Sequence, residues 1–172
     1  MRLTIIMFLF MHLASCSKET KPLKTVEEVD LEKYMGKWYD IVHYPATFLN
    51  GCDNITAEYS LSKKNYVKVH NRCQRIKSDK EKSIDGKAFV VKGSNNSKLK
   101  VQFFWPFRAD YWILELDEDY QYAVVGGPSR NYAWILARSP HPDEEVIQRL
   151  LKLLEKKGFD TSMMIRTHHD EK

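Results

Sequence analysis

The sequence predicts an all-β domain, an eight-stranded antiparallel up-and-down β-barrel with one α-helix packed outside it. Three observations support this prediction. Segments in which every second residue is apolar recur about every ten to fifteen residues, as expected for half-buried strands. Short turn sequences such as Gly126-Gly127-Pro128 separate these segments, and short connections make neighbouring strands antiparallel. After the eighth segment, the apolar spacing changes to that of a helix.

The second segment shows the strand pattern most clearly. Ile55, Ala57, Tyr59 and Leu61 are apolar, and the residues between them are polar. Eight strands form a barrel of about the size that encloses one small ligand. In chain order, the predicted strands cover residues 38–44, 53–61, 66–74, 84–91, 98–104, 111–116, 120–125 and 132–138.

Helical signals flank the strands on both sides. Residues 31–35 read as a single turn capped by Asp30, and Gly36 permits the sharp bend that follows. After the last strand, acidic residues open a helix that carries a broad apolar stripe and closes at Gly158. We expect this stripe to cover the outside of the barrel, with a short ninth strand over residues 161–167.

The N-terminal residues predict export and a lipid anchor. The apolar run over residues 3–13 is too short for a stable membrane span and is typical of a secretory signal peptide. The sequence Leu13-Ala14-Ser15-Cys16 resembles a bacterial lipobox, in which Cys16 is acylated, for example with palmitate. An ordinary signal peptide cleaved near a cysteine is the alternative.

These signals divide the chain into three parts. We expect a signal peptide over residues 1–15, a lipid-anchored tether over residues 16–30 and the folded domain over residues 31–172. Ser17, by resemblance to lipoprotein sorting in Gram-negative bacteria, favours the outer membrane, with the domain facing the periplasm.

Cys52 and Cys73 remain once Cys16 is assigned to the anchor. Two cysteines in an exported chain suggest a disulfide, with two free thiols as the alternative. The hairpin of the second and third strands brings them close together but one residue out of step. A disulfide between them therefore requires a β-bulge near one end of the hairpin.

Composition and charge argue against several kinds of partner. The 172 residues suit one domain, and the formal net charge of +4 comes from interspersed basic and acidic residues. Nucleic-acid binding would favour a clustered basic patch. We expect no cofactor and no metal, because the pair His168-His169 has no third ligand near it in the sequence.

The chain contains three ordered motifs, Gly36-Lys37-Trp38-Tyr39, Leu116-Asp117-x-x-Tyr120-x-x-Ala123 and Trp134-Ile135-Leu136-Ala137-Arg138-Ser139-Pro140. They resemble the motifs of the lipocalins, in the form found in bacterial lipoprotein members of the apolipoprotein D type. The resemblance extends from Leu31 to Thr167, and the acid-rich second motif lacks the threonine of the vertebrate form. It implies a calyx whose closed end is formed by Gly36, Trp38 and Arg138, with the arginine lying across the tryptophan.

Strand parity identifies a candidate ligand pocket above this closed end. Of Tyr111 and Trp112, only one can face inward, and the sequence leaves open which one. The alternative is that these side chains simply fill the barrel. The candidate pocket residues are Val101, Phe103, Trp105, Tyr111, Trp112, Tyr132 and Trp134, next to Leu99.

An apolar, aromatic cavity suits an acyl chain with a polar head. We therefore expect a monomeric or homodimeric carrier that binds, stores or transports fatty acids or lysophospholipids at the outer membrane. The alternatives are a lipid-modifying enzyme on the same barrel, or a carrier of another hydrophobic ligand such as a pigment. No catalytic residue is predicted, because His43, His70 and His141 are scattered, and the first two are expected to face solvent from strands.

Overall fold

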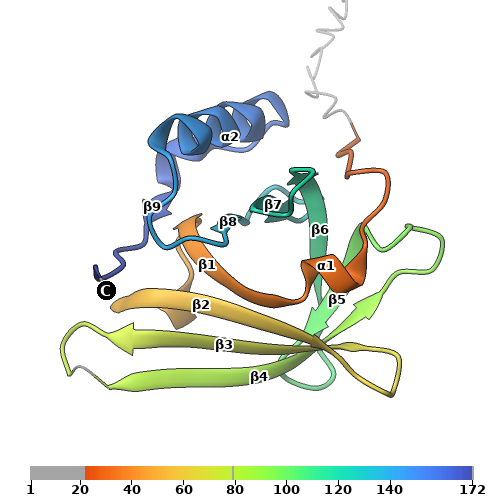
Figure 1. The fold of residues 1–172 in the computed structure, drawn as a ribbon, viewed down its shortest axis with the longest axis horizontal. Helices are drawn as coiled ribbons and strands as arrows, with labels where there is room; N and C mark the ends of the chain where they lie inside the picture. Colours follow the sequence, from red (N-terminus) through yellow and green to blue (C-terminus); the bar gives the residue numbers. More distant parts are fainter. Residues whose placement is uncertain (1–21, 79, 172) are drawn as a thin grey trace, which may run out of the picture.

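The computed structural model describes residues 22–78 and 80–171, and its centre is a closed antiparallel β-barrel (Figure 1). Each strand pairs with its sequence neighbours, and β1 pairs with both β8 and β2, which closes the ring. The predicted fold class is therefore confirmed. The barrel strands are β1 Gly36–His43, β2 Cys52–Leu61, β3 Val67–Arg75, β4 Glu81–Val90, β5 Lys98–Gln102, β6 Ala109–Leu116, β7 Tyr122–Gly126 and β8 Ala133–Ala137.

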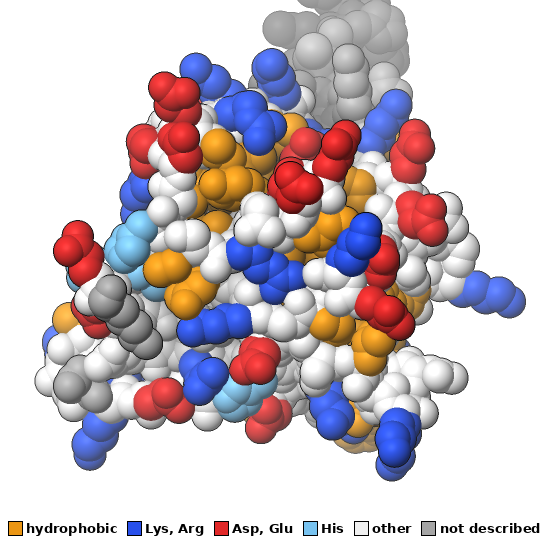
Figure 2. Space-filling model, in the orientation of Figure 1, with side chains coloured by type: hydrophobic (Ala, Val, Ile, Leu, Met, Phe, Trp, Pro, Cys, Tyr) orange, Lys and Arg blue, Asp and Glu red, His pale blue; other side chains and the backbone are white. Residues whose placement is uncertain are grey.

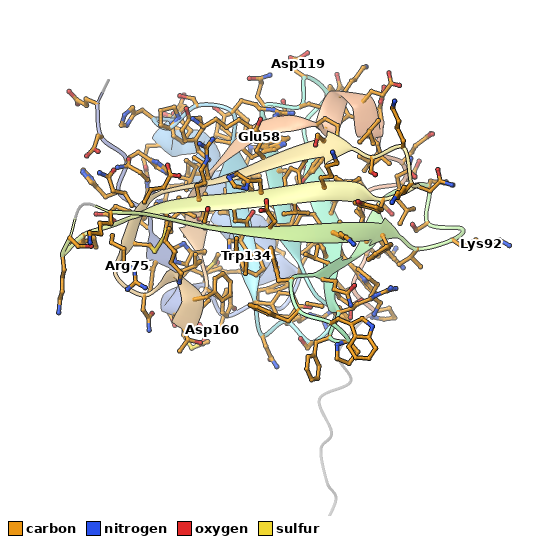
Figure 3. The ribbon with its side chains drawn as sticks, turned by 90° about the horizontal axis from the view of Figure 1, so that it is seen from below. Glu58, Arg75, Lys92, Asp119, Trp134 and Asp160 are labelled. Atoms are coloured by element: carbon orange, nitrogen blue, oxygen red, sulfur yellow. A yellow bond between two sulfur atoms is a disulfide. The ribbon has the colours of Figure 1, made fainter. Side chains whose placement is uncertain are left out.

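The connections between strands alternate between the two ends of the barrel. The short helix α1 (Leu31–Tyr34) leads directly into β1, so it lies at the same end as the β2–β3, β4–β5 and β6–β7 connections. We call this the closed end and the opposite one the open end. Figure 3 shows Asp119, from the β6–β7 connection, at one end, Asp160 toward the other, and Trp134 between them.

The barrel wall separates two apolar cores. The inner cluster includes Trp38, Val69, Leu99 and Leu136, and the outer cluster lies between the barrel and helix α2 (Glu144–Lys156). Successive residues of a strand point alternately into and out of the barrel. In the part of the wall next to α2, both sets of residues are apolar, because each set belongs to one of the two clusters. The predicted role of the helix as an outer cover is confirmed. From α2, the residues Ile147, Leu150 and Leu154 are buried in the outer cluster.

The predicted ninth strand is largely wrong. Thr161–Met163 form the 3-10 helix η2, because the Asp160 side chain accepts hydrogen bonds from the backbone and hydroxyl of Ser162. Only β9, Ile165–Arg166, remains extended, and it pairs with the end of β1.

Part of the segment predicted as a tether, residues 22–30, is packed against the barrel. Leu23 lies in the outer cluster and Val29 in the inner one. Val26 donates a backbone hydrogen bond to Ile113, and Val29 donates one to Asn95. This part of the predicted tether therefore belongs to the folded domain. Cys16 and the predicted signal peptide lie outside the described residues.

Cys52 and Cys73 form the predicted disulfide, and the required β-bulge is present. The β2–β3 register shifts between Asp53 and Thr56, and Asn54 within the shift has a φ of 52°. Asparagine tolerates this left-handed conformation better than most residues. The Asn54 side chain also donates to Asp170 at 2.6 Å, which joins the bulge to the C-terminal segment.

Candidate ligand-binding interior and its closed end

The closed end begins with a single capped turn. Asp30 starts α1 because its side-chain Oδ1 accepts hydrogen bonds from the backbone N–H groups of Glu32 and Lys33 at 2.9 and 3.3 Å. The chain then enters β1 through Gly36, whose φ is +91°. A Cβ at this position would lie 3.4 Å from Nη1 of Arg138, which is an ordinary contact, so the backbone conformation is what favours glycine.

Trp38 and Arg138 form the plug of the barrel. The Trp38 ring is fully buried and donates through Nε1 to the Tyr34 carbonyl at 2.9 Å, and the Arg138 guanidinium carbon lies 3.9 Å from the ring centroid. Burial lowers the pKa of Arg138 from its ordinary value. The guanidinium donates to backbone carbonyl oxygens of Lys37 (2.8 Å), Lys33 (2.9 Å), Tyr34 (3.2 Å), Met35 (2.8 Å) and Tyr120 (3.2 Å).

These contacts assign Arg138 a structural role. This one side chain joins α1, the start of β1 and the β6–β7 connection. It also donates hydrogen bonds to the backbone carbonyl groups at the C-terminal end of α1, which have no partner within the helix. The stacking that the motifs implied is present.

Three tyrosine hydroxyls meet in the interior above the plug. Tyr34 comes from α1, Tyr59 from β2 and Tyr111 from β6; the Tyr111 hydroxyl lies 2.8 Å from that of Tyr34 and 3.1 Å from that of Tyr59. Burial raises the pKa of Tyr59 to about 12 and raises the pKa values of Tyr34 and Tyr111 well above the ordinary value. The site therefore disfavours negative charge and keeps the three hydroxyls neutral.

Several aromatic side chains beside these tyrosines are only partly buried. Val101, Phe103 and Trp134 belong to or pack against the inner cluster. Tyr111 and Trp134 pack against the inner cluster, and each keeps part of its surface accessible. The rings therefore border space that a ligand can occupy.

Tyr111, not Trp112, is the inward-facing member of that pair. Trp112 packs against the outer cluster, and the Lys98 ammonium lies 4.3 Å from the centroid of its ring. The assignment of Trp112 to the pocket is therefore wrong, because successive residues of β6 point to opposite faces of the wall.

Two other predicted pocket residues lie at the open end. Trp105 is 86% exposed, because β5 ends at Gln102 and its alternation does not continue into the β5–β6 connection; its assignment to the pocket is wrong. Tyr132 is half-buried in the β7–β8 connection, where its hydroxyl donates to the Asp110 carbonyl at 3.0 Å and its ring lies 5.7 Å from that of Trp134. Tyr132 thus borders the mouth of the barrel.

His43 is buried, although the sequence predicted that it would face solvent. Its Nδ1 lies 3.1 Å from the Asp40 carboxylate, and the Thr167 hydroxyl lies 3.2 Å from the same nitrogen. A register shift in β1 between Asp40 and Val42 alters the alternation, and the C-terminal segment covers this face through His169. Within residues 22–78 and 80–171, no group of three or more His, Cys, Asp or Glu side chains is arranged to hold a metal ion.

Sequence reasoning missed Tyr34 and Tyr59 as interior residues. Tyr59 occupies the apolar face of the second predicted strand, which was a usable signal. Tyr34 reaches the interior from a single helical turn, where no periodicity can be detected.

Two depressions on the outer surface of the barrel are polar. A depression across β2, β3 and β4 is lined largely by charged and polar side chains, including Glu58, Lys68 and Asp85. A second lies beside Glu118, Asp119 and Arg138. Figure 2 shows acidic and basic side chains interspersed over the visible face.

A closed antiparallel barrel with an arginine–tryptophan plug, an accessible aromatic interior and one outer helix defines a binding protein of the calyx type. The chain belongs to the lipocalin-like family, because the family profile described as "Lipocalin-like domain" matches residues 29–169. This confirms the resemblance inferred from the three motifs. Proteins of this family generally bind small hydrophobic ligands.

Named relatives place the chain near bacterial lipoproteins. It is 35% identical over 154 residues to the outer membrane lipoprotein Blc of Vibrio cholerae, covering 89% of this chain and 90% of the relative. It is 36% identical to apolipoprotein D of Mus musculus over 172 residues, covering 91% and 83% of the two chains. Among solved structures, insecticyanin of Manduca sexta superposes with a TM-score of 0.70 over 87% of this chain and 85% of its own, at 22% identity, which shows the shared fold.

Proposed function

We propose that this protein is a lipid-anchored lipocalin of the bacterial outer membrane that binds fatty acids or lysophospholipids. The observation that carries the proposal is the apolar inner cluster, in which Tyr111 and Trp134 remain partly accessible. Burial of an acyl chain contributes roughly 0.8 kcal/mol for each CH₂ group. A long chain therefore reaches micromolar affinity even after the cost of association is subtracted.

The charged head of such a lipid lies at the open end. The floor of the interior is unsuitable, because the raised pKa values of its three tyrosines mark a site that disfavours negative charge. Lys82 lies near the open end of β4, on the same face of that strand as the buried Ala88. Its ammonium donates to the Phe48 carbonyl of the β1–β2 connection at 3.0 Å. Lys82 is therefore placed to attract a carboxylate or phosphate at the mouth.

The anchor is proposed at Cys16, after cleavage of residues 1–15, with the domain on the periplasmic side. Relatives named as outer membrane lipoproteins support this location. In the region that the structure covers, no helix is long and apolar enough to cross a membrane. Replacement of Cys16 by Ser should abolish palmitate incorporation and move the protein out of the outer-membrane fraction.

Lipid recovery tests the binding function directly. Protein purified from its own membrane is examined by native mass spectrometry and by lipid extraction. We expect one fatty acid or lysophospholipid for each barrel. An empty barrel that converts a lipid substrate to product would instead support a lipid-modifying enzyme, and a bound pigment would support the other alternative.

A further inference from the structure

The open end carries the most exposed apolar side chains in the described part of the protein. Trp105, Phe107 and Phe104 are 86%, 77% and 69% exposed, and all three lie in the β5–β6 connection. Ile76 in the β3–β4 connection and Phe48 in the β1–β2 connection are 62% and 52% exposed. In Figure 3, aromatic side chains project at the end opposite Asp119. Apolar groups gathered at one end of a protein mark an interaction surface.

The connections at the open end carry a net positive charge, whereas those at the closed end are balanced. The four open-end connections, residues 44–51, 76–80, 103–108 and 127–132, contain four basic residues and one acidic residue in the sequence. The three closed-end connections, residues 62–66, 91–97 and 117–121, contain three basic and three acidic residues. A surface that combines aromatic and basic side chains is complementary to a bilayer with anionic headgroups.

The N-terminal segment approaches the barrel from the open end. Lys157 donates a hydrogen bond to the Lys24 carbonyl at 3.3 Å, and its own carbonyl accepts one at 2.7 Å from Arg130 of the β7–β8 connection. The described chain begins at Pro22, six residues after Cys16. Six residues span at most about 20 Å, so an acyl group on Cys16 would hold the open end close to the membrane.

We propose that the open end docks on an anionic phospholipid bilayer. The side chains of Phe104, Trp105 and Phe107 enter the interfacial layer. Lys77, Lys80 and Arg108 face the headgroups. The mouth of the barrel then opens onto the membrane, and a lipid passes between bilayer and interior without crossing bulk water. This inference rests on the proposed lipid-binding function and adds the surface from which the lipid is taken.

Fluorescence quenching tests the docking. The mature protein purified from its membrane is reconstituted into vesicles of phosphatidylethanolamine and phosphatidylglycerol with brominated acyl chains. The emission of Trp105 is obtained by subtracting the spectrum of the Trp105→Phe variant, which removes the reporter and keeps an aromatic ring. We expect a blue shift and loss of most of this emission. Replacing Lys77 and Lys80 by Gln should raise the fraction of anionic lipid needed for half-maximal quenching.

A reporter at the other end supplies the matched control. Leu61 is 48% exposed at the closed end of β2, and Leu61→Trp in the Trp105→Phe background should stay unquenched. Unquenched Trp105, or equal quenching of the two reporters, would overturn the proposed docking. Protection of Trp105 from acrylamide without vesicles would also overturn it, because a second copy of the chain would then cover the surface.

The docking and the lipid-binding function can fail separately. Lipid recovered from protein with unquenched Trp105 would refute the docking alone. Protein that is quenched on vesicles but yields no lipid would refute the binding function alone.

Discussion

At the scale of single residues, Arg138 connects more parts of the closed end than any other side chain described above. It stacks on Trp38 and donates to carbonyl oxygens of α1, β1 and the β6–β7 connection. Arginine suits this position because its planar fork of five donors can serve several acceptors while its face covers a ring. The contribution of Arg138 should therefore appear in stability, not in ligand binding.

Replacement of Arg138 by Ala should lower the free energy of unfolding by about 3 kcal/mol. The loss combines the cation–π contact with carbonyl groups left without a protein donor. Urea denaturation measures it, and lipid affinity should change little. Arg138→Lys is the control, since it keeps the charge but not the fork, and it should lie between the two. Identical unfolding curves for wild type and Arg138→Ala would refute the role of the plug.

The tyrosine cluster predicts a loss of stability at high pH. Folding raises the pKa of Tyr59 from 10.0 to about 12, so its contribution is complete below pH 10 and is lost as the pH rises through about 12. Tyr34 and Tyr111 shift in the same direction. Phenolate absorbance at pH 11 should therefore show fewer than the nine tyrosines of the sequence ionised in the folded protein. Ionisation of all nine at their ordinary pKa without unfolding would contradict the buried cluster.

At the scale of elements, alternation and turn chemistry predicted the barrel because each strand has its apolar face toward one of two cores. The alternation rule failed where a strand ended or where both of its faces were buried. It could not show that β5 stops at Gln102, because residues 103–105 remain apolar. It could not separate Tyr111 from Trp112, because β6 is covered on both faces. The packing of Leu23 and Val29 depends on grooves that form only in the folded protein.

The β2–β3 hairpin illustrates how far register reasoning reaches. The mismatch between Cys52 and Cys73 required a bulge, but only the structure identifies Asn54 as the residue in the left-handed conformation. Local sequence therefore predicted that the bulge exists, whereas its position also depends on contacts with Asp170 and His168 in the distant C-terminal segment.

Removal of the disulfide should destabilise the protein measurably. The cross-link joins residues 21 positions apart in the sequence. Removing a cross-link that closes a loop of this length increases the conformational entropy of the unfolded chain. The free energy of unfolding should therefore fall by about 3 kcal/mol. Denaturation of the Cys52→Ala, Cys73→Ala double variant measures the effect, with reduced wild type as the control. Coincident curves for the oxidised wild type and the double variant would show that the cross-link does not contribute.

At the scale of the whole molecule, the two ends of the barrel have different tasks. The closed end is fixed by Arg138 and α1, while the open end presents aromatic connections and the mouth of the interior. In the proposed function, the lipid enters through the open end, and its tail extends toward the three tyrosines above the plug. This arrangement relates the family's binding role to the proposed position at a membrane.

Affinity across a series of lysophospholipids with increasing chain length tests the central claim most directly. If the acyl chain is buried in the interior, each added CH₂ should lower the dissociation constant by up to roughly fourfold until the tail reaches the floor. Titration calorimetry with monomeric lipid below its micellar concentration measures the series. A dissociation constant that does not change with chain length would show that the barrel interior does not hold the lipid tail.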